Sequence, residues 1–128
     1  MKNEKKKILV IDDSRMIRET IRFALEVNGF NVLTAKDGEE GLFIAEKEQP
    51  DEIVMDWNMP KLDGKALVKK LQLGEQTKDI PIIVMSASSK SELGESDESI
   101  NTKGYFQKDS FVLERLVSAL HNQVPVLV

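Results

Sequence analysis

The chain has 128 residues, of which 41% are hydrophobic and 31% charged, with a net charge of −4 and no cysteine. This length suits one domain, and the mild acidity argues against nucleic acid as a main partner, because proteins that bind phosphate backbones usually present a basic face. The lack of cysteine excludes disulfides and thiolate chemistry, and no apolar stretch approaches the roughly 20 residues that span a bilayer, so we expect no membrane insertion and a cytoplasmic location.

The first apolar run is ILVI at 8–11, a continuous and β-branched stretch that predicts a strand covered on both faces. The lysines just before it, 5–7, are interpreted as a solvated lead-in. Residues 14–29 then predict a helix that ends at Gly29. Its predicted inward stripe consists of Met16, Ile17, Ile21, Ala24 and Leu25.

A second strand is predicted over 30–35, followed by a helix over 37–50. Asp37 and Glu40 stand in capping-box spacing at the start of that helix, and Pro50 ends it. The run EIVMD at 52–56 predicts a third strand. A third helix is predicted over 64–73, with Ala66, Leu67 and Leu71 facing inward.

The remaining elements are a fourth strand over 80–86, a short fifth over 104–107 and a last helix over 110–124. That helix is expected to bury Phe111, Leu116, Ala119 and Leu120. The segment 88–103 has only two apolar residues and low helix propensity, so any helix there is expected to be short or mobile.

Strict alternation of strands and helices predicts an α/β fold with a parallel sheet, right-handed crossovers and helices on both faces. Five strands of this length suit the doubly wound, flavodoxin-like order 2-1-3-4-5, in a single domain over 1–128. In such sheets ligands bind beyond the carboxyl ends of the strands, at the switch point between strands 1 and 3.

Acidic residues end both strands that flank this switch point: Asp12 and Asp13 follow the first strand, and Asp56 ends the third. Repulsion among three converging carboxylates would raise their pKa values unless a cation were present. A hard, oxygen-seeking ion such as Mg²⁺ meets this need and leaves a position for a phosphate oxygen. The alternative interpretation is that Asp12 and Asp13 cap the following helix.

Ser86 and Lys108 end the fourth and fifth strands and add a hydroxyl and an ammonium to the same edge. Each alone would mean little, since a serine there can be a loop hydroxyl and a lysine a solvated charge. The ammonium could pair with a carboxylate or with a phosphoryl group. Acids, hydroxyl and lysine at the ends of different parallel strands together make a far more specific pattern than any one of them.

With these motifs the chain resembles the receiver domain of bacterial response regulators, and most closely the single-domain, CheY-like chemotaxis type. The resemblance covers essentially the whole chain and rests on ILVIDDS, VMDWNMPKLDG, IIVMSAS and GYFQK, in this order. The family has the strand order 2-1-3-4-5, so the predicted topology is not independent of the resemblance.

The resemblance implies that Asp56 is the phosphoacceptor, which attacks a phosphohistidine on a partner to form an acyl phosphate. It implies that Asp13 and Asp56 bind Mg²⁺ directly, with Mn²⁺ as a substitute. Asp12 would act through water, and the backbone carbonyl of Asn58 would complete the protein's share of ligands.

By the same resemblance, Ser86 hydrogen-bonds the phosphoryl group and Lys108 pairs with it. Tyr105 matches the aromatic switch residue whose ring turns inward on phosphorylation, and the alternative is a static, half-buried strand aromatic. One departure is that the family usually has Lys-Pro with a cis peptide where this chain has KDSF. A cis bond before a non-proline residue costs about 3 kcal/mol and is not assumed here.

The implied function is signalling, not catalysis on other molecules, with a histidine kinase or histidine phosphotransfer protein as donor. No separate output domain is expected, so the output would be a non-covalent partner such as a flagellar motor switch component or a phosphatase, and the chain a monomer or weak dimer. The alternatives are a phosphorelay intermediate and a docking module that works without phosphorylation. An aspartyl-phosphate hydrolase is disfavoured, because Asn58 stands where a second acid is needed.

Overall fold

The computed structural model describes residues 5–59, 62–86, 103–109 and 111–122. Within these ranges five strands form: β1 (Lys7–Ile11), β2 (Asn31–Ala35), β3 (Glu52–Asp56), β4 (Ile82–Ser86) and β5 (Gly104–Gln107). The helices there are α1 (Arg15–Val27), α2 (Gly38–Glu48), α3 (Gly64–Leu73) and α4 (Val112–Asn122). The predicted helix between the last two strands lies, apart from Lys103, outside the described residues.

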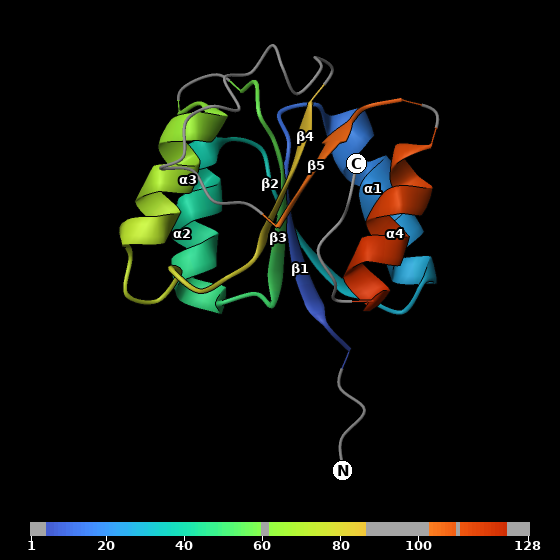
Figure 1. Ribbon diagram of the computed structural model, residues 1–128, viewed down its shortest axis with the longest axis horizontal. Coiled ribbons are helices and arrows are strands. Elements are labelled where there is room, and N and C mark those ends of the chain that lie inside the picture. The colour runs from blue at the N-terminus through green and yellow to red at the C-terminus, as the bar shows by residue number, and fades with distance from the viewer. Residues whose placement is uncertain (1–4, 60–61, 87–102, 110, 123–128) are drawn as a thin grey trace.

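The strands form one parallel sheet in the order β2-β1-β3-β4-β5, which confirms the predicted doubly wound α/β fold. Helices α2 and α3 cover one face, and α1 and α4 cover the other (Figure 1). None of the helices in the described ranges combines the length and apolar character that a bilayer crossing requires. The carboxyl ends of all five strands point to the same edge, which is where the candidate site lies.

The central strands are apolar along their whole length because each lies between two layers of helices. Every residue of β3 and β4 is buried. Alternate side chains serve opposite faces: Val10 and Val54 pack on the side of α1 and α4, whereas Leu9 and Met55 pack on the side of α2 and α3. A continuous apolar run is therefore the pattern that this position in the sheet requires.

The start of α2 shows how local side chains set the helix boundaries. Asp37 is its N-cap, and its carboxylate accepts a hydrogen bond from the backbone N–H of Glu40 at 2.8 Å. Glu40 in turn accepts from the backbone N–H of Lys36 at 2.7 Å, one residue earlier than in a standard capping box. The predicted capping pair is thus present in a shifted form.

Two residues predicted to face inward are exposed. Met16 is 78% exposed, whereas Ile21 and Leu25 on the same helix are buried, because α1 also carries apolar residues on the face turned away from the sheet. Phe111 is 63% exposed, because it precedes Val112, the first residue of α4, and lies in the turn that leads into the helix. Both predictions are wrong.

The predicted solvated lead-in is also wrong for Lys6, which belongs to a buried charge cluster with Glu52 and Lys103. Glu52 is 3% exposed and accepts from Lys6 Nζ and Lys103 Nζ, each at 2.8 Å. Lys6 Nζ also donates to the backbone carbonyl of Leu120 at 2.7 Å, near the carboxyl end of α4. These three side chains, called here the Glu52 cluster, tie β3 to α4 at the edge opposite the candidate site.

Candidate functional site

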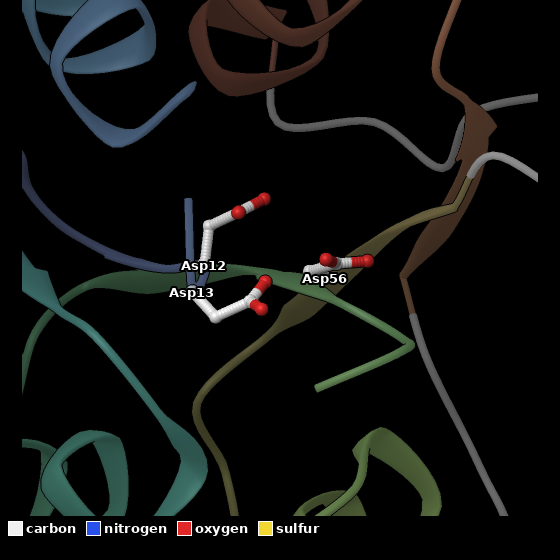
Figure 2. Close-up of side chains that lie close together, drawn as sticks. All are labelled: Asp12, Asp13 and Asp56. Atoms are coloured by element: carbon white, nitrogen blue, oxygen red, sulfur yellow. The ribbon is translucent and has the colours of Figure 1, made fainter. Parts of the chain in front are cut away.

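The first and third strands deliver three carboxylates to one place. β1 and β3 are neighbours in register, with Ile11 beside Met55, so Asp12 and Asp56 come next to each other. One carboxylate oxygen from each of Asp12, Asp13 and Asp56 lies within 4.8 Å of the others, and the side chains project from the ends of β1 and β3 (Figure 2). Asp12 and Asp56 are buried, while Asp13 is exposed and leaves one side of the group open to solvent.

The turn after β1 holds Asp12 away from the helix that follows it. Ser14 is the N-cap of α1, and its hydroxyl accepts from the backbone N–H of Ile17 at 3.3 Å. Asp12 instead accepts from the backbone N–H of Ser14 at 2.9 Å, and its own backbone carbonyl accepts from Arg18 Nη1 at 2.8 Å. The interpretation of Asp12 and Asp13 as helix caps is therefore wrong.

The loop after β3 folds back tightly beside Asp56. The backbone N–H of Asn58 donates to Asp56 Oδ1 at 3.2 Å, and the N–H of Gly64 donates to the carbonyl of Trp57 at 2.9 Å. A Cβ at position 64 would lie 2.6 Å from that carbonyl oxygen, which explains why glycine starts α3. This close approach holds the segment after the acidic residue against the start of the helix.

Lys108 brings a cation to two of the three acids. Its Nζ lies 2.9 Å from Asp12 Oδ2 and 3.2 Å from Asp56 Oδ2, and its backbone N–H donates to the carbonyl of Ser86 at 2.7 Å. Burial disfavours the charged ammonium, but the hydrogen bond to Asp12 and the charges of both acids outweigh burial and raise the pKa of Lys108. The lysine is therefore held in its charged form.

Asp56 has the opposite problem, since its surroundings oppose its charge. Burial, together with the charge of Asp12, raises the pKa of Asp56 above its usual value in spite of the attraction of Lys108. Among the described residues, the three carboxylates have one ammonium beside them, that of Lys108, which contacts two of them, so the group carries an excess of negative charge. Oxygen donors with such an excess and one open side fit a hard divalent cation.

The other predicted residues lie along the same edge. Ser86 is the last residue of β4 and is buried, and its Oγ accepts from Asn58 Nδ2 at 3.4 Å. Tyr105 is half-buried in β5, opposite Val84, and packs on the side of α2 and α3. Sequence reasoning missed the side chain of Asn58 and also Arg18, because neither contact has a sequence signal of its own.

Residues 8–121 match the family model described as the response regulator receiver domain. Among curated proteins, the chain is 44% identical over 87 residues to a probable transcriptional regulator ycf27 of Porphyra purpurea, covering 68% of this chain and 35% of that protein. It is 48% identical over 82 residues to the alkaline phosphatase synthesis transcriptional regulatory protein PhoP of Bacillus subtilis, covering 64% and 33%. The chain thus spans about a third of the length of these relatives.

Solved structures match over nearly the whole chain. The chemotaxis response regulator CheY4 of Vibrio cholerae superposes with a TM-score of 0.83 at 32% identity, covering 93% of this chain and 98% of that one. The receiver domain of the Francisella response regulator 1452 gives a TM-score of 0.81 at 33% identity, covering 92% and 95%.

Proposed function

The chain belongs to the response regulator receiver domain family, and on that premise we propose that it is a phosphoacceptor whose Asp56 takes a phosphoryl group in a Mg²⁺-dependent reaction. The observation that carries the proposal is the acid group with its lysine: three carboxylates within 4.8 Å of one another, two of them in contact with Lys108 Nζ. Phosphoryl transfer relies on positioning and on neutralisation of charge, and this arrangement offers both.

In this proposal Asp13 and Asp56 hold the ion directly, Asp12 acts through water, and the backbone carbonyl of Asn58 contributes a further oxygen. Bound there, the ion supplies positive charge for the phosphoryl oxygens. The acid group fits this task because its donors are all oxygens and their negative charge exceeds the positive charge of the single lysine.

The protein's own part in the transfer is to position and to neutralise charge. A carboxylate oxygen of Asp56 attacks the phosphorus of a phosphohistidine, so that an O–P bond forms as the N–P bond of the donor breaks. Lys108, now 3.2 Å from Asp56 Oδ2, pairs with the phosphoryl oxygens, and the hydroxyl of Ser86 donates to one of them. Tyr105 lies in β5 two residues before Gln107, which pairs with Ser86. We propose that its ring turns inward when Asp56 is phosphorylated.

For the output we propose chemotaxis-type signalling, in which a separate protein such as a flagellar motor switch component or a phosphatase binds the phosphorylated form. The similarity to CheY4, which extends over 98% of that chain, supports this proposal. The similarity to PhoP and to ycf27 favours a second candidate, a receiver that controls transcription. The two candidates share the same chemistry at Asp56 and differ only in what binds afterwards.

The test uses intact mass and Trp57 fluorescence, since Trp57 directly follows Asp56. Incubation with acetyl phosphate and Mg²⁺ should add one phosphoryl group, and the fluorescence should change with Mg²⁺ and again with the phosphodonor. Asp56→Asn should abolish the mass gain and the second fluorescence change. Asp79→Asn, an exposed aspartate that precedes β4 at the opposite edge, is the matched control and should behave as the parent chain.

A mass gain that persists in Asp56→Asn would show that another residue is the acceptor. A parent chain that gains no mass with or without Mg²⁺ would favour a docking module independent of phosphorylation. A phosphorylation-dependent pull-down from the native host would then separate a motor or phosphatase partner from a transcriptional one.

A further inference from the structure

The turn after β5 is organised around Asp109, the residue next to Lys108. Asp109 Oδ1 accepts from the backbone N–H of Phe111 at 2.9 Å, and its backbone carbonyl accepts from the N–H of Val112 at 3.3 Å. An aspartate that accepts from the amide two residues ahead forms a local turn of its own. The described residues contain no cis peptide bond, so this turn is made with trans geometry at Lys108–Asp109.

Arg115 of α4 contacts both this turn and the end of β5. Its Nη2 donates to Asp109 Oδ1 at 2.7 Å and to the carbonyl of Gln107 at 3.4 Å, and its guanidinium carbon lies 5.7 Å from the ring centre of Phe106. Phe106 is fully buried, so the arginine rests on a rigid surface. Among the described residues Arg115 Nε finds no hydrogen-bond partner, so the terminal nitrogen and the ring hold this side chain.

Hydrogen bonds therefore hold the backbone at Lys108 and at the residue that follows it. Its own N–H is bonded to the carbonyl of Ser86 at 2.7 Å, and the next residue is held by Phe111 and Arg115. A lysine side chain is a flexible four-carbon stem, so its ammonium can be confined only if the start of the stem is confined. Within the part of the chain that the structure describes, neither Asp109 nor Arg115 forms a hydrogen bond or ion pair with Asp12, Asp13 or Asp56.

We propose that Asp109 and Arg115 are positioning residues that hold the ammonium of Lys108 between Asp12 and Asp56. The proposal rests on the proposed function in one respect, namely that Lys108 neutralises the phosphoryl group. The proposed role of this surface ion pair is to fix a position. Isolated ion pairs of this exposure add little to stability. Displacement of a catalytic group by about 1 Å, however, can cost up to about 100-fold in rate.

The chain offers a matched control in the pair of Glu19 and Arg22 on α1. Its side chains are 46% and 43% exposed, against 46% and 35% for Asp109 and Arg115. Glu19→Ala and Asp109→Ala therefore each remove the acid of an ion pair of similar exposure, and Asp109→Ala also removes the oxygen that accepts from the N–H of Phe111. Only Asp109→Ala should affect the acid group.

The main experiment measures the initial rate of phosphorylation by acetyl phosphate at saturating Mg²⁺. Asp109→Ala should slow the reaction roughly threefold to tenfold, and Glu19→Ala should leave the rate unchanged. Asp109→Asn keeps the oxygen that accepts from Phe111 and should recover part of the loss. In a Lys108→Ala background, Asp109→Ala should cause no further decrease, because the residue that it positions is gone.

A second readout does not depend on phosphorylation. Lys108 competes with a metal ion for Asp12 and Asp56, so Lys108→Ala should tighten Mg²⁺ binding measured by Trp57 fluorescence, and Asp109→Ala should shift it in the same direction by a smaller factor. The proposal is overturned if Asp109→Ala equals Glu19→Ala in both readouts, or if it slows phosphorylation equally with and without Lys108. If the parent chain is never phosphorylated, the proposed function fails, and the Mg²⁺ titration still decides on the positioning role.

Discussion

The first and last residues of β3, Glu52 and Asp56, are both buried carboxylates, but their surroundings differ in sign. Glu52 lies between two ammonium groups at 2.8 Å each, and each of them also donates to a backbone carbonyl near the end of α4. Asp56 shares the ammonium of Lys108 with Asp12, and the carboxylate of Asp13 also lies nearby. One end of the strand has an excess of positive charge and the other an excess of negative charge.

The difference teaches that a buried acid is not by itself a functional site. At the Glu52 cluster every charge has a protein partner, so nothing is left for a ligand to supply. At Asp56 the protein leaves the charges unbalanced, and the pKa of the carboxyl is raised as a consequence. Unbalanced charge of this kind costs stability and is retained where an outside cation or anion completes the site.

The largest effect is expected at Glu52. Glu52→Gln removes the carboxylate that lies between Lys6 and Lys103 and should lower the free energy of unfolding by about 2–3 kcal/mol in urea titrations. The loss is placed below that of a fully buried pair because the lysine side chains are 18% and 13% exposed. Glu48→Gln is the control, since its contact with Lys7 is 3.8 Å long and about two-fifths exposed. Equal losses of unfolding free energy in both variants would show that the contacts of Glu52 stabilise the fold no more than an exposed ion pair does.

A smaller effect of opposite sign is expected at Asp56. Asp56→Asn removes a negative charge that burial and the charge of Asp12 disfavour. It should therefore raise the free energy of unfolding at pH 7 by about 0.5–2 kcal/mol. Gains of this size are common when a destabilising residue of a functional site is replaced. The same urea titration, without divalent ions, measures it. A lower free energy of unfolding in Asp56→Asn would mean that the attraction between Asp56 and Lys108 outweighs the repulsion between Asp56 and Asp12.

The gain from Asp56→Asn should also depend on pH. Folding raises the pKa of Asp56, so the stability associated with its protonated form is fully present below the ordinary carboxyl value of 3.8 and is lost as the pH rises through the raised pKa. The difference in unfolding free energy between parent and variant should therefore shrink as the pH falls toward 3.8. A difference that stays constant over this range would contradict a raised pKa.

The smallest of these effects is the response to metal. Mg²⁺ that binds only the folded acid group should stabilise the parent chain by about 1 kcal/mol at a free concentration near five times its dissociation constant. Glu52→Gln should keep this increment in thermal melts, whereas Asp13→Asn should lose most of it, and EDTA should reverse it. If Asp13→Asn responds like the parent chain, Mg²⁺ binds elsewhere.

Much of the architecture could be predicted because the relevant signals are local. The apolar runs ending in Asp12 and Asp56 predicted strands, and the alternation with helices predicted that both residues reach the same edge, where the structure brings them together with Lys108. The role of each residue in phosphoryl transfer remains a prediction. Met16 was placed on the wrong face, because helical period gives the spacing of apolar residues but not which of two apolar faces meets the sheet. Phe111 was wrongly placed inside the last helix, which begins only at Val112.

The sequence by itself determined the order of strands and helices and the residues that end each strand, since these depend on neighbours along the chain and on the geometry of parallel sheets. Only the tertiary structure decided which charged side chains pair with one another. Lys6 and Lys103 come from distant segments to meet Glu52, and Asp109 is fastened by Arg115 from the next helix. The partners of Glu52 are set by the folded structure, because the energy of an ion pair depends on the distance in space between its charges and on their burial.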